Sequence, residues 1–418
     1  MPSIDAQELD GPRPVRQAEW AAVRRLDALC FPGFVDEAEE PPLRFGGAGG
    51  GSARHTSPRH EDIEVLCYRG MPISKIGIYY NQVNMCGNPL RIASIGGVCT
   101  HPDYEGQGLA TRLLDHCARK ATGLGARLML ISGMRGLYTR AGYVTAQDYE
   151  HVVLKPGQLC PTIRCCPAIR CSALPSLRPA TEADASSCAH LYQMEPVHFM
   201  RRVEKFTRHF HWRERFPQAE DWIVEVGGRP AAYIFSGIPW ECWPATCASI
   251  REVVEYAGSR VALASGLARV IAQPELREMR LFVPWQDVDF LQLLRGQDAA
   301  GEHVPLPGHT MRIVNFPGLM SDLRPYVRAR LTESQRRGLR FEQEKGPALS
   351  GSAGDCYAIV RGRERVELDG TAMTRLVMGN LERMANGEWR MAIGSGVLAE
   401  IVPALFPLPA FLPGLNFQ

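Results

Sequence analysis

The 418 residues include 47 Lys and Arg against 45 Asp and Glu, and the resulting formal net charge of +2 provides no basic field for nucleic acid. Hydrophobic residues make up 45% and charged residues 22%, the balance of a globular chain long enough for several domains. There is no apolar run of about 18 residues to span a membrane, no secretory signal at the start, and the thirteen cysteines are too dilute for a disulfide scaffold, so a reducing cytoplasm is expected.

The first segment, 1–157, alternates strand and helix patterns. Apolar residues near helical spacing (Ala18, Ala22, Leu26 and Leu29) predict an amphipathic helix in 16–31, and the Gly-, Pro- and Ser-rich stretch 39–62 predicts a mobile loop. The later patterns predict a hairpin of strands (63–70 and 74–85), a strand (90–100), a helix (108–122), a buried strand (126–133), a helical turn (134–144) and a strand that closes the sheet (150–156).

The second segment, 173–316, repeats this order. It predicts a short strand and helix in 176–193, a hairpin in 221–238 that turns at Gly227 and Gly228, a strand and helix in 250–273, and a strand in 278–287. The repeat differs at the turn before its second helix, where Gly258 is the single glycine in place of the Gly106 and Gly108 pair.

The linker 158–172 carries Cys160, Cys165, Cys166 and Cys171. Four close thiols are potential zinc ligands, but the spacing fits no paired C-x2-C motif and the stretch contains prolines, so incidental thiols are favoured over a metal site.

The third segment, 317–418, predicts strands in 354–370, a helix in 371–387 and a further helix from Leu398. It ends in a proline-rich tail in which Phe406, Phe411, Leu412, Leu415 and Phe417 are apolar. A chain end is commonly loose, but this composition predicts a tail that docks on the folded protein.

The stretch "VCTHPDYEGQGLATRLL", 98–114, has the features of a diphosphate site. A strand leads into a turn with Gly106 and Gly108, and a helix opens on the turn, so main-chain N–H groups and the positive helix end converge. Glycine allows an oxygen to approach the backbone closely. A plain strand-to-helix turn is the alternative interpretation of the same letters.

The stretch resembles motif A of the GNAT acetyltransferases, with matches at Gly108 and Ala110 and a departure at Glu105, where the family has Arg or Gln. The resemblance implies acetyl-CoA bound along Val98–Thr100, with its pyrophosphate on the amides of 106–111. The cofactor-binding residues it implies are Val98, Cys99, Thr100, Gly106, Gln107, Gly108, Leu109, Ala110, Thr111, Gly133 and Met134. A carboxylate at position 105 that points to solvent costs about 0.3–1 kcal/mol near a helix end, and Gln107 or Arg112 offsets part of it.

The order of the three segments resembles the enhanced-intracellular-survival (Eis-type) acetyltransferases. The resemblance implies an α+β chain: a catalytic GNAT domain (1–157), a linker (158–172), a degenerate GNAT-like domain without CoA (173–316) and a sterol-carrier-like α+β domain (317–418). The tandem GNAT folds would be mixed, mostly antiparallel sheets flanked by helices. The resemblance also implies a homo-oligomer in the form of a closed ring, a hexamer.

The expected reaction is direct transfer of an acetyl group from acetyl-CoA to a primary amine on a small molecule or peptide, without a metal. Transfer requires an acid for the leaving thiolate, and Tyr138 in "GLYTRAGY" is the candidate because a phenol and a thiolate have comparable pKa values. A half-buried packing aromatic is its structural alternative, and Tyr143 is the competitor. The Eis-type resemblance implies that the α-carboxylate of Gln418 is the base. Glu61 and Glu105 are alternative carboxylates.

The histidines favour no catalytic or metal site. His101 could be read as a general base, but a surface-loop residue is favoured. His198, His209 and His211 could be read as a metal set, but the segment reads better as a basic amphipathic helix, whose basic face could meet a partner subunit, an acidic ligand or, as is commonest, water. An alternative function is a non-catalytic protein that senses acetyl-CoA or binds an apolar ligand. The acceptor site is expected from loops such as 31–44 and 240–243.

Overall fold

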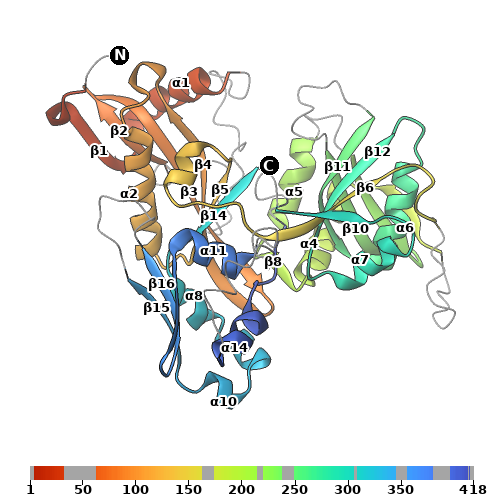
Figure 1. The fold of residues 1–418 in the computed structure, drawn as a ribbon. Coiled ribbons are helices and arrows are strands. Elements are labelled where there is room, and N and C mark those ends of the chain that lie inside the picture. Colours follow the sequence, from red (N-terminus) through yellow and green to blue (C-terminus); the bar gives the residue numbers. More distant parts are fainter. Residues whose placement is uncertain are drawn as a thin grey trace. The chain divides into compact units, whose positions relative to one another are not determined.

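The computed structural model describes residues 4–32, 63–161, 174–213, 220–237, 249–305, 308–344, 355–379, 396–412 and 414. These residues form two compact units (Figure 1). The first unit comprises the described residues of Met1–Ala146 and Pro307–Leu408, and the second comprises those of Gln147–Leu306 and Pro409–Leu415.

The first unit contains a mixed sheet with the strand order β1-β2-β3-β4-β5-β14. Its strands are β1 (Leu9–Pro14), β2 (Ile63–Tyr68), β3 (Met71–Met85), β4 (Asn88–Thr100), β5 (Leu128–Ser132) and β14 (His309–Ile313). All neighbours along this order are antiparallel except β4 and β5, which are parallel because helix α2 (Leu109–Gly123) connects the end of one to the start of the other. The predicted hairpin and its neighbouring strand are confirmed.

Helices α1 (Trp20–Cys30) and α2 cover opposite faces of this sheet, because successive side chains of β2 point alternately toward one helix and the other. Ile63, Val65 and Cys67 pack with Val23 of α1, whereas Leu66 and Tyr68 belong to the core that contains the apolar side of α2. All six residues of β2 are therefore buried. The predicted amphipathic helix is confirmed, but Leu29 on its expected apolar side is 50% exposed.

The strand predicted to close the first sheet belongs to the other sheet. β6 (Asp148–Leu154) pairs with β12 (Glu278–Pro284) and β13 (Gly301–Pro305) in the second unit. The edge beside β5 is filled instead by β14, which follows the second segment in the chain. The prediction for 150–156 was wrong because a buried strand carries no local signal that identifies its partner.

The rest of the first unit is a small α+β layer. Its antiparallel sheet has the order β15-β16-β17, and β16 and β17 confirm the predicted strands. The elements are α8 (Phe316–Asp322), α9 (Arg324–Arg330), α10 (Glu333–Arg336), β15 (Leu339–Glu344), β16 (Cys356–Arg361), β17 (Glu364–Asp369), α11 (Gly370–Met378) and α14 (Leu398–Leu405). α11 begins where the Asp369 carboxylate accepts hydrogen bonds from the amides of Thr371 and Ala372, both at 2.8 Å.

The second unit repeats the strand order of the first. Its sheet runs β13-β6-β12-β11-β10-β9-β7, with β11 and β12 as the parallel pair joined by helix α6. The remaining elements are β7 (Ser176–Pro179), α4 (Ala185–Gln193), β8 (Val197–Phe199), α5 (Val203–Arg213), β9 (Glu220–Val226), β10 (Arg229–Gly237), β11 (Ile250–Gly258), α6 (Arg260–Ile271) and α7 (Val288–Arg295). The order of β7, β9, β10, β11 and β12 with helices α4 and α6 confirms the predicted repeat, whereas β8, α5 and β13 have no counterpart among the described residues of the first segment.

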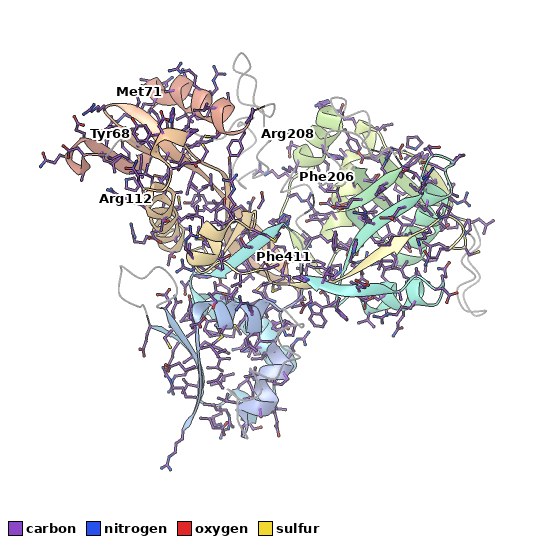
Figure 2. The ribbon with its side chains drawn as sticks, turned by 45° about the horizontal axis from the view of Figure 1, so that its top comes forward. Tyr68, Met71, Arg112, Phe206, Arg208 and Phe411 are labelled. Carbon is purple, nitrogen blue, oxygen red and sulfur yellow. The ribbon has the colours of Figure 1, made fainter. Side chains whose placement is uncertain are left out.

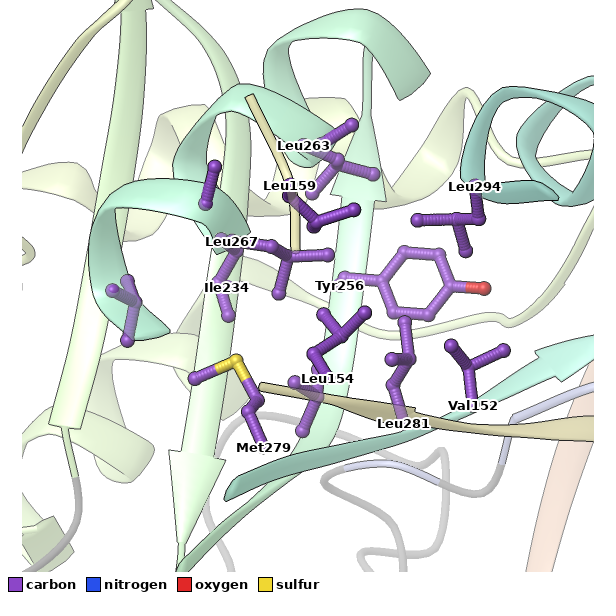
Figure 3. Packing of buried hydrophobic residues seen from close by; sticks show 14 of the residues in the cluster. Val152, Leu154, Leu159, Ile234, Tyr256, Leu263, Leu267, Met279, Leu281 and Leu294 are labelled. Carbon is purple, nitrogen blue, oxygen red and sulfur yellow. The ribbon is translucent and has the colours of Figure 1, made fainter. Parts of the chain in front are cut away.

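The core of the second unit shows why β6 belongs there. Figure 3 shows Val152 and Leu154 of β6 among Met279 and Leu281 of β12 and Leu263 of α6. All five side chains are fully buried. Removing β6 from this sheet would expose apolar side chains from several elements at once.

Both units are α+β with mixed, mostly antiparallel sheets flanked by helices, as expected. Across the part of the chain that the structure describes, no helix combines the length and apolarity needed to cross a membrane.

Candidate functional site

The two parallel strands of the first sheet separate before they end. β4 and β5 pair only from Ile92 with Leu128 to Ile95 with Ile131, although β4 continues to Thr100. A β-bulge with positive φ at Gly97 (φ 55°) follows the paired part and increases the local twist. The backbone of β4 beyond Ile95 therefore has no strand partner in β5.

The turn after β4 presents an open helix start. Gly106 and Gly108 have φ angles of 75° and 76°, a left-handed conformation that glycine adopts without strain, and Gly108 is the N-cap of α2. A Cβ added at either glycine would meet no atom within 4 Å. Gly108, the N-cap residue of α2, has no side chain that could accept hydrogen bonds from the first N–H groups of the helix.

The residues expected to bind the cofactor lie in three places: strand β4, the turn with the start of α2, and the residues that follow β5. Val98 and Cys99 are buried in β4 and Thr100 is half-buried, whereas Gly106, Gln107, Gly108 and Thr111 are exposed at the turn and helix start. Leu109 is buried beneath them and Ala110 is half-buried. Gly133 and Met134 follow β5, where the amide of Gly133 donates to the Gly308 carbonyl at 2.6 Å and Met134 is 57% exposed.

Glu105 and Arg112 have separate surroundings. Glu105 is exposed and ends the short 3-10 helix Pro102–Tyr104. Arg112 is exposed on α2 and its guanidinium donates to the Gly11 carbonyl at 3.1 Å (Figure 2). The Arg112 guanidinium is therefore directed toward β1. Its positive charge offsets the negative charge of Glu105 less than the sequence indicated.

Replacing Gly108 with Ala is expected to weaken acetyl-CoA binding by at least about tenfold. The methyl group would occupy the open side of the turn, and the positive φ would cost about 1 kcal/mol. Gly87→Ala is the matched control, because Gly87 also has positive φ (83°) and open space but lies in the β3–β4 hairpin. Calorimetry with acetyl-CoA measures both variants, and equal affinities would contradict a ligand at Gly108.

Tyr138 lies in the short helix α3 (Gly136–Arg140), directly after β5. Its side chain is 4% exposed, and a Cβ on Gly133 would lie 3.0 Å from its ring, so this glycine makes room for the tyrosine. Burial raises the pKa of the Tyr138 phenol above its usual value, the Arg135 charge opposes this, and the nearby Cys99 thiol adds to it.

Tyr143 has a packing environment. It is 1% exposed within the first core, and its hydroxyl donates to the Met129 sulfur at 3.5 Å. Burial raises its pKa strongly. Tyr138 belongs to the same core as Tyr143, so burial alone does not distinguish the two tyrosines of "YTRAGY".

A polar group behind β4 was missed in the sequence. Lys75 of β3, 4% exposed, contacts the Asp27 carboxylate of α1 at 2.6 Å, and burial raises the pKa of Asp27 against the opposing charge of Lys75. Two thiols adjoin this pair: Cys99 lies 3.9 Å from Asp27, and Cys30 lies 3.4 Å from the Thr100 carbonyl. The hydrogen bond with Cys99 lowers the pKa of Cys30. The signal in the sequence that could have revealed this group is Lys75 itself, a charged residue in a predicted strand that is largely apolar.

The remaining polar candidates each have a local role. His101 accepts from the Asp103 amide at 3.3 Å, His209 contacts Asp221 at 2.7 Å, and His211 contacts Glu182 at 2.9 Å. His209 is buried, so the face of α5 that carries it is not the solvated face predicted. The described residues contain no group of three or more potential metal ligands.

Several expected residues lie outside the described part of the chain. They are Glu61, Cys165, Cys166, Cys171, most of 31–44, all of 240–243, Leu415, Phe417 and Gln418. Cys160 is described and exposed.

Comparison with known proteins agrees with this geometry. Residues 12–146 match the family described as "Acetyltransferase (GNAT) domain". A GCN5-related N-acetyltransferase from Kribbella flavida has a similar structure, with a TM-score of 0.62, 13% sequence identity and coverage of 97% of this chain and 98% of that chain. A GCN5-related N-acetyltransferase from Anabaena variabilis gives a TM-score of 0.61, 14% identity and coverage of 96% and 97%.

Eis1 from Mycobacterium abscessus is also similar, with a TM-score of 0.59, 14% identity and coverage of 94% of this chain and 96% of that chain. At such low identity these structures establish the fold only. A search of curated protein sequences found no match.

The fold and the match over 12–146 define an enzyme that carries a GNAT acetyltransferase domain. Domains of this class transfer an acyl group from acetyl-CoA to an acceptor that is a small molecule or a peptide. The open turn and the separated strands described above lie within the matched residues.

Proposed function

We propose that the protein is an Eis-type N-acetyltransferase that moves the acetyl group of acetyl-CoA directly to a primary amine. The open helix start at Gly106–Gly108, beside the separated ends of β4 and β5, is the observation that carries this proposal. Main-chain N–H groups of 106–111 would hold the pyrophosphate, and the backbone of Val98–Thr100 would hold the pantetheine arm.

Tyr138 is the proposed general acid. Its position after β5 and its raised pKa keep the phenol protonated at neutral pH, ready to donate to the departing thiolate. Gly133 and Met134 would border the thioester from the β5 side. The adjacent strand ends would exclude water from one side of the reacting thioester and so strengthen electrostatic interactions there.

The proposed base is the terminal carboxylate of Gln418. A terminal carboxyl has a pKa of about 3.3–3.7 and is ionised at neutral pH, so it attracts a cationic amine and accepts its proton, directly or through water. Support comes from the preceding segment, in which Phe406, Leu408, Ala410 and Phe411 are between 0% and 4% exposed. The predicted docking of the tail is confirmed as far as these residues.

The proposed organisation has three parts along the chain, 1–157, 173–316 and 317–418, with 158–172 as a linker. β6, near the end of the first part, and β14, near the end of the second, each complete the sheet of the other part. The last domain would be sterol-carrier-like, the assembly a hexameric ring, and the location cytoplasmic. The repeat of strand order in the second unit and the separate β15-β16-β17 sheet support the three parts.

A panel of amines tests the function. The purified chain is incubated with acetyl-CoA and each amine, including aminoglycosides, polyamines and lysine peptides, and free CoA thiol is measured. Turnover that depends on a primary amine is expected, and N-methylated analogues without an N–H should give none. Binding of acetyl-CoA in calorimetry without turnover on any amine would contradict the proposal and favour a sensing role.

A further inference from the structure

The second unit has its own counterpart of the candidate site. β11 and β12 pair only from Ile250 with Glu278 to Val253 with Leu281, although β11 continues to Gly258, and a β-bulge follows the paired part. Helix α6 then begins at Arg260, after Gly258 and the N-cap residue Ser259, whereas α2 begins directly after its N-cap residue Gly108. By strand order, pairing and bulge, this region of the second unit corresponds to the acetyl-CoA region proposed in the first.

Groups of the same chain fill the turn between β11 and α6. The amide of Gly258 donates to Glu195 at 2.9 Å, and the Arg260 guanidinium contacts the same carboxylate at 2.6 Å and Asp287 at 2.8 Å. The Ser259 hydroxyl accepts from the Ala262 amide at 3.4 Å. The Glu195 carboxylate is therefore the anion bound at this turn, where a phosphate would bind in an open site. The Arg260 guanidinium, the neighbouring cation, is already paired with carboxylates of the protein.

Gly258 does not provide an open turn. A Cβ at this position would overlap the Ala231 carbonyl oxygen and lie 2.8 Å from the Ala232 Cα. The glycine is required because β10 approaches closely, whereas Gly106 and Gly108 face open space.

The C-terminal segment lies beside the ends of the separated strands. The Gln286 side chain donates to the Ala410 carbonyl at 2.6 Å and accepts from the Ala410 amide at 3.1 Å, as a neighbouring strand would. Tyr149 donates to the Phe411 carbonyl at 2.7 Å, and the Phe411 ring packs edge-on against Phe199 at 5.4 Å. Figure 2 shows Phe411 among the side chains around it.

The segment also reaches β11. A Cβ on Gly414 would overlap the Glu255 carboxylate, which is fully buried and contacts Arg201 at 2.6 Å and the Tyr233 hydroxyl at 2.7 Å. A cavity of about 290 Å³ remains, and its lining includes Glu195, Tyr256, Arg260, Asp287, Ala410 and Leu412. This volume is at the small end for a ligand site and holds much less than a whole CoA.

We infer that the described residues of the C-terminal segment, 409–412 and Gly414, and the Glu195 carboxylate together occupy, in the second unit, the region that corresponds to the acetyl-CoA region of the first. The tail takes the place of a pantetheine arm and Glu195 that of a phosphate. The second unit is thus an internal binding site for the chain's own end. The correspondence with acetyl-CoA rests on the proposed function.

Hydrogen exchange of the tail in the full-length protein tests the occupancy. Gln286→Ala removes both hydrogen bonds to Ala410, so exchange of the Ala410 amide should accelerate at least about tenfold. Tyr149→Phe, which removes only one hydroxyl, should accelerate exchange at 410–412 in the same direction and keeps the test valid if Gln286→Ala folds poorly. Unchanged exchange in folded Gln286→Ala or in Tyr149→Phe would overturn the inference.

Gln158→Ala is the matched control. Its side chain also makes two hydrogen bonds to backbone in the second unit, to the Asp298 carbonyl at 2.6 Å and from the Lys155 amide at 3.1 Å, without touching the tail. Tail exchange in this variant should equal that of the wild type. Equal acceleration in Gln158→Ala and Gln286→Ala would indicate general loosening and overturn the inference.

Calorimetry supplies the second readout. One acetyl-CoA per wild-type chain is expected, because Glu195 and the C-terminal segment fill the corresponding region of the second unit, and two per chain would overturn the inference. Absence of all binding would contradict the proposed function, and the exchange experiment would still decide whether the tail is held by Gln286 and Tyr149.

Discussion

Replacing Tyr138 with Phe is expected to lower kcat by about 10²- to 10⁴-fold, the usual contribution of a positioned general acid. The acetyl-CoA dissociation constant should stay within about twofold, because the phenol is expected to act on the leaving thiolate and the cofactor is held mainly by backbone groups. Steady-state rates and calorimetry on one preparation separate the two effects.

Tyr143→Phe is the matched control for this experiment. It removes the same hydroxyl from a tyrosine five residues along the chain, whose partner is the Met129 sulfur in the core. A small loss of stability without loss of kcat is expected. If Tyr138→Phe retained the wild-type rate, or Tyr143→Phe lost as much, Tyr138 would not be the acid.

The pH dependence follows from the direction of the pKa shift. Burial raises the Tyr138 pKa above 10.0, so the phenol remains protonated, and able to donate, at every pH below that value. Wild-type kcat should therefore show no descending limb between about pH 7 and pH 10 from this group.

The order of elements could be predicted because each depends on local sequence. The helix α2 and the strands around it follow from apolar periodicity, and the open turn follows from Gly106 and Gly108. The repeat in the second unit was visible for the same reason. The parallel pair β4–β5 required only the rule that a crossover helix joins parallel strands.

Pairings between distant strands could not be predicted in this way. β6 (DYEHVVL) and β14 (HTMRI) are both short strands that mix polar and apolar residues, so composition alone does not assign either of them to the edge beside β5. Side-chain packing decides that β6 joins the second sheet and β14 the first. Val152 and Leu154 of β6 fit the core of the second unit, and no local sequence pattern reveals this fit. The Lys75–Asp27 contact was missed for the same reason, since its partners are 48 residues apart.

The two units show that the same arrangement of strands and helix can form an open site in one unit and a filled region in the other. Both units have separated parallel strands, a bulge and a helix start, so the fold alone would predict two equivalent cofactor sites. The absence of the glycine pair at 258–260 predicted the loss of CoA binding. The groups that close the region, Glu195 and the segment near Ala410, lie far away in the sequence and could be found only in the folded chain.

Extending the chain beyond Gln418 is expected to reduce kcat by about 10²-fold or more. Adding two residues, Gly-Ser, converts the proposed base into a neutral peptide group and moves the carboxylate away, so the loss should match that of a general base. The segment up to Leu412 is held by Gln286 and Tyr149 whether or not residues are added, so the fold and the acetyl-CoA affinity should be unchanged.

The same Gly-Ser pair added before Met1 is the control for the extended chain. It adds equal length and polarity but leaves the terminal carboxylate in place, so turnover should equal that of the wild type. Because a carboxylate with a pKa of about 3.3–3.7 is ionised throughout the neutral range, added acetate or formate should restore part of the rate in the C-terminally extended enzyme. Full activity of that enzyme without such rescue would remove the terminus from the mechanism and direct attention to the other carboxylates near the acceptor.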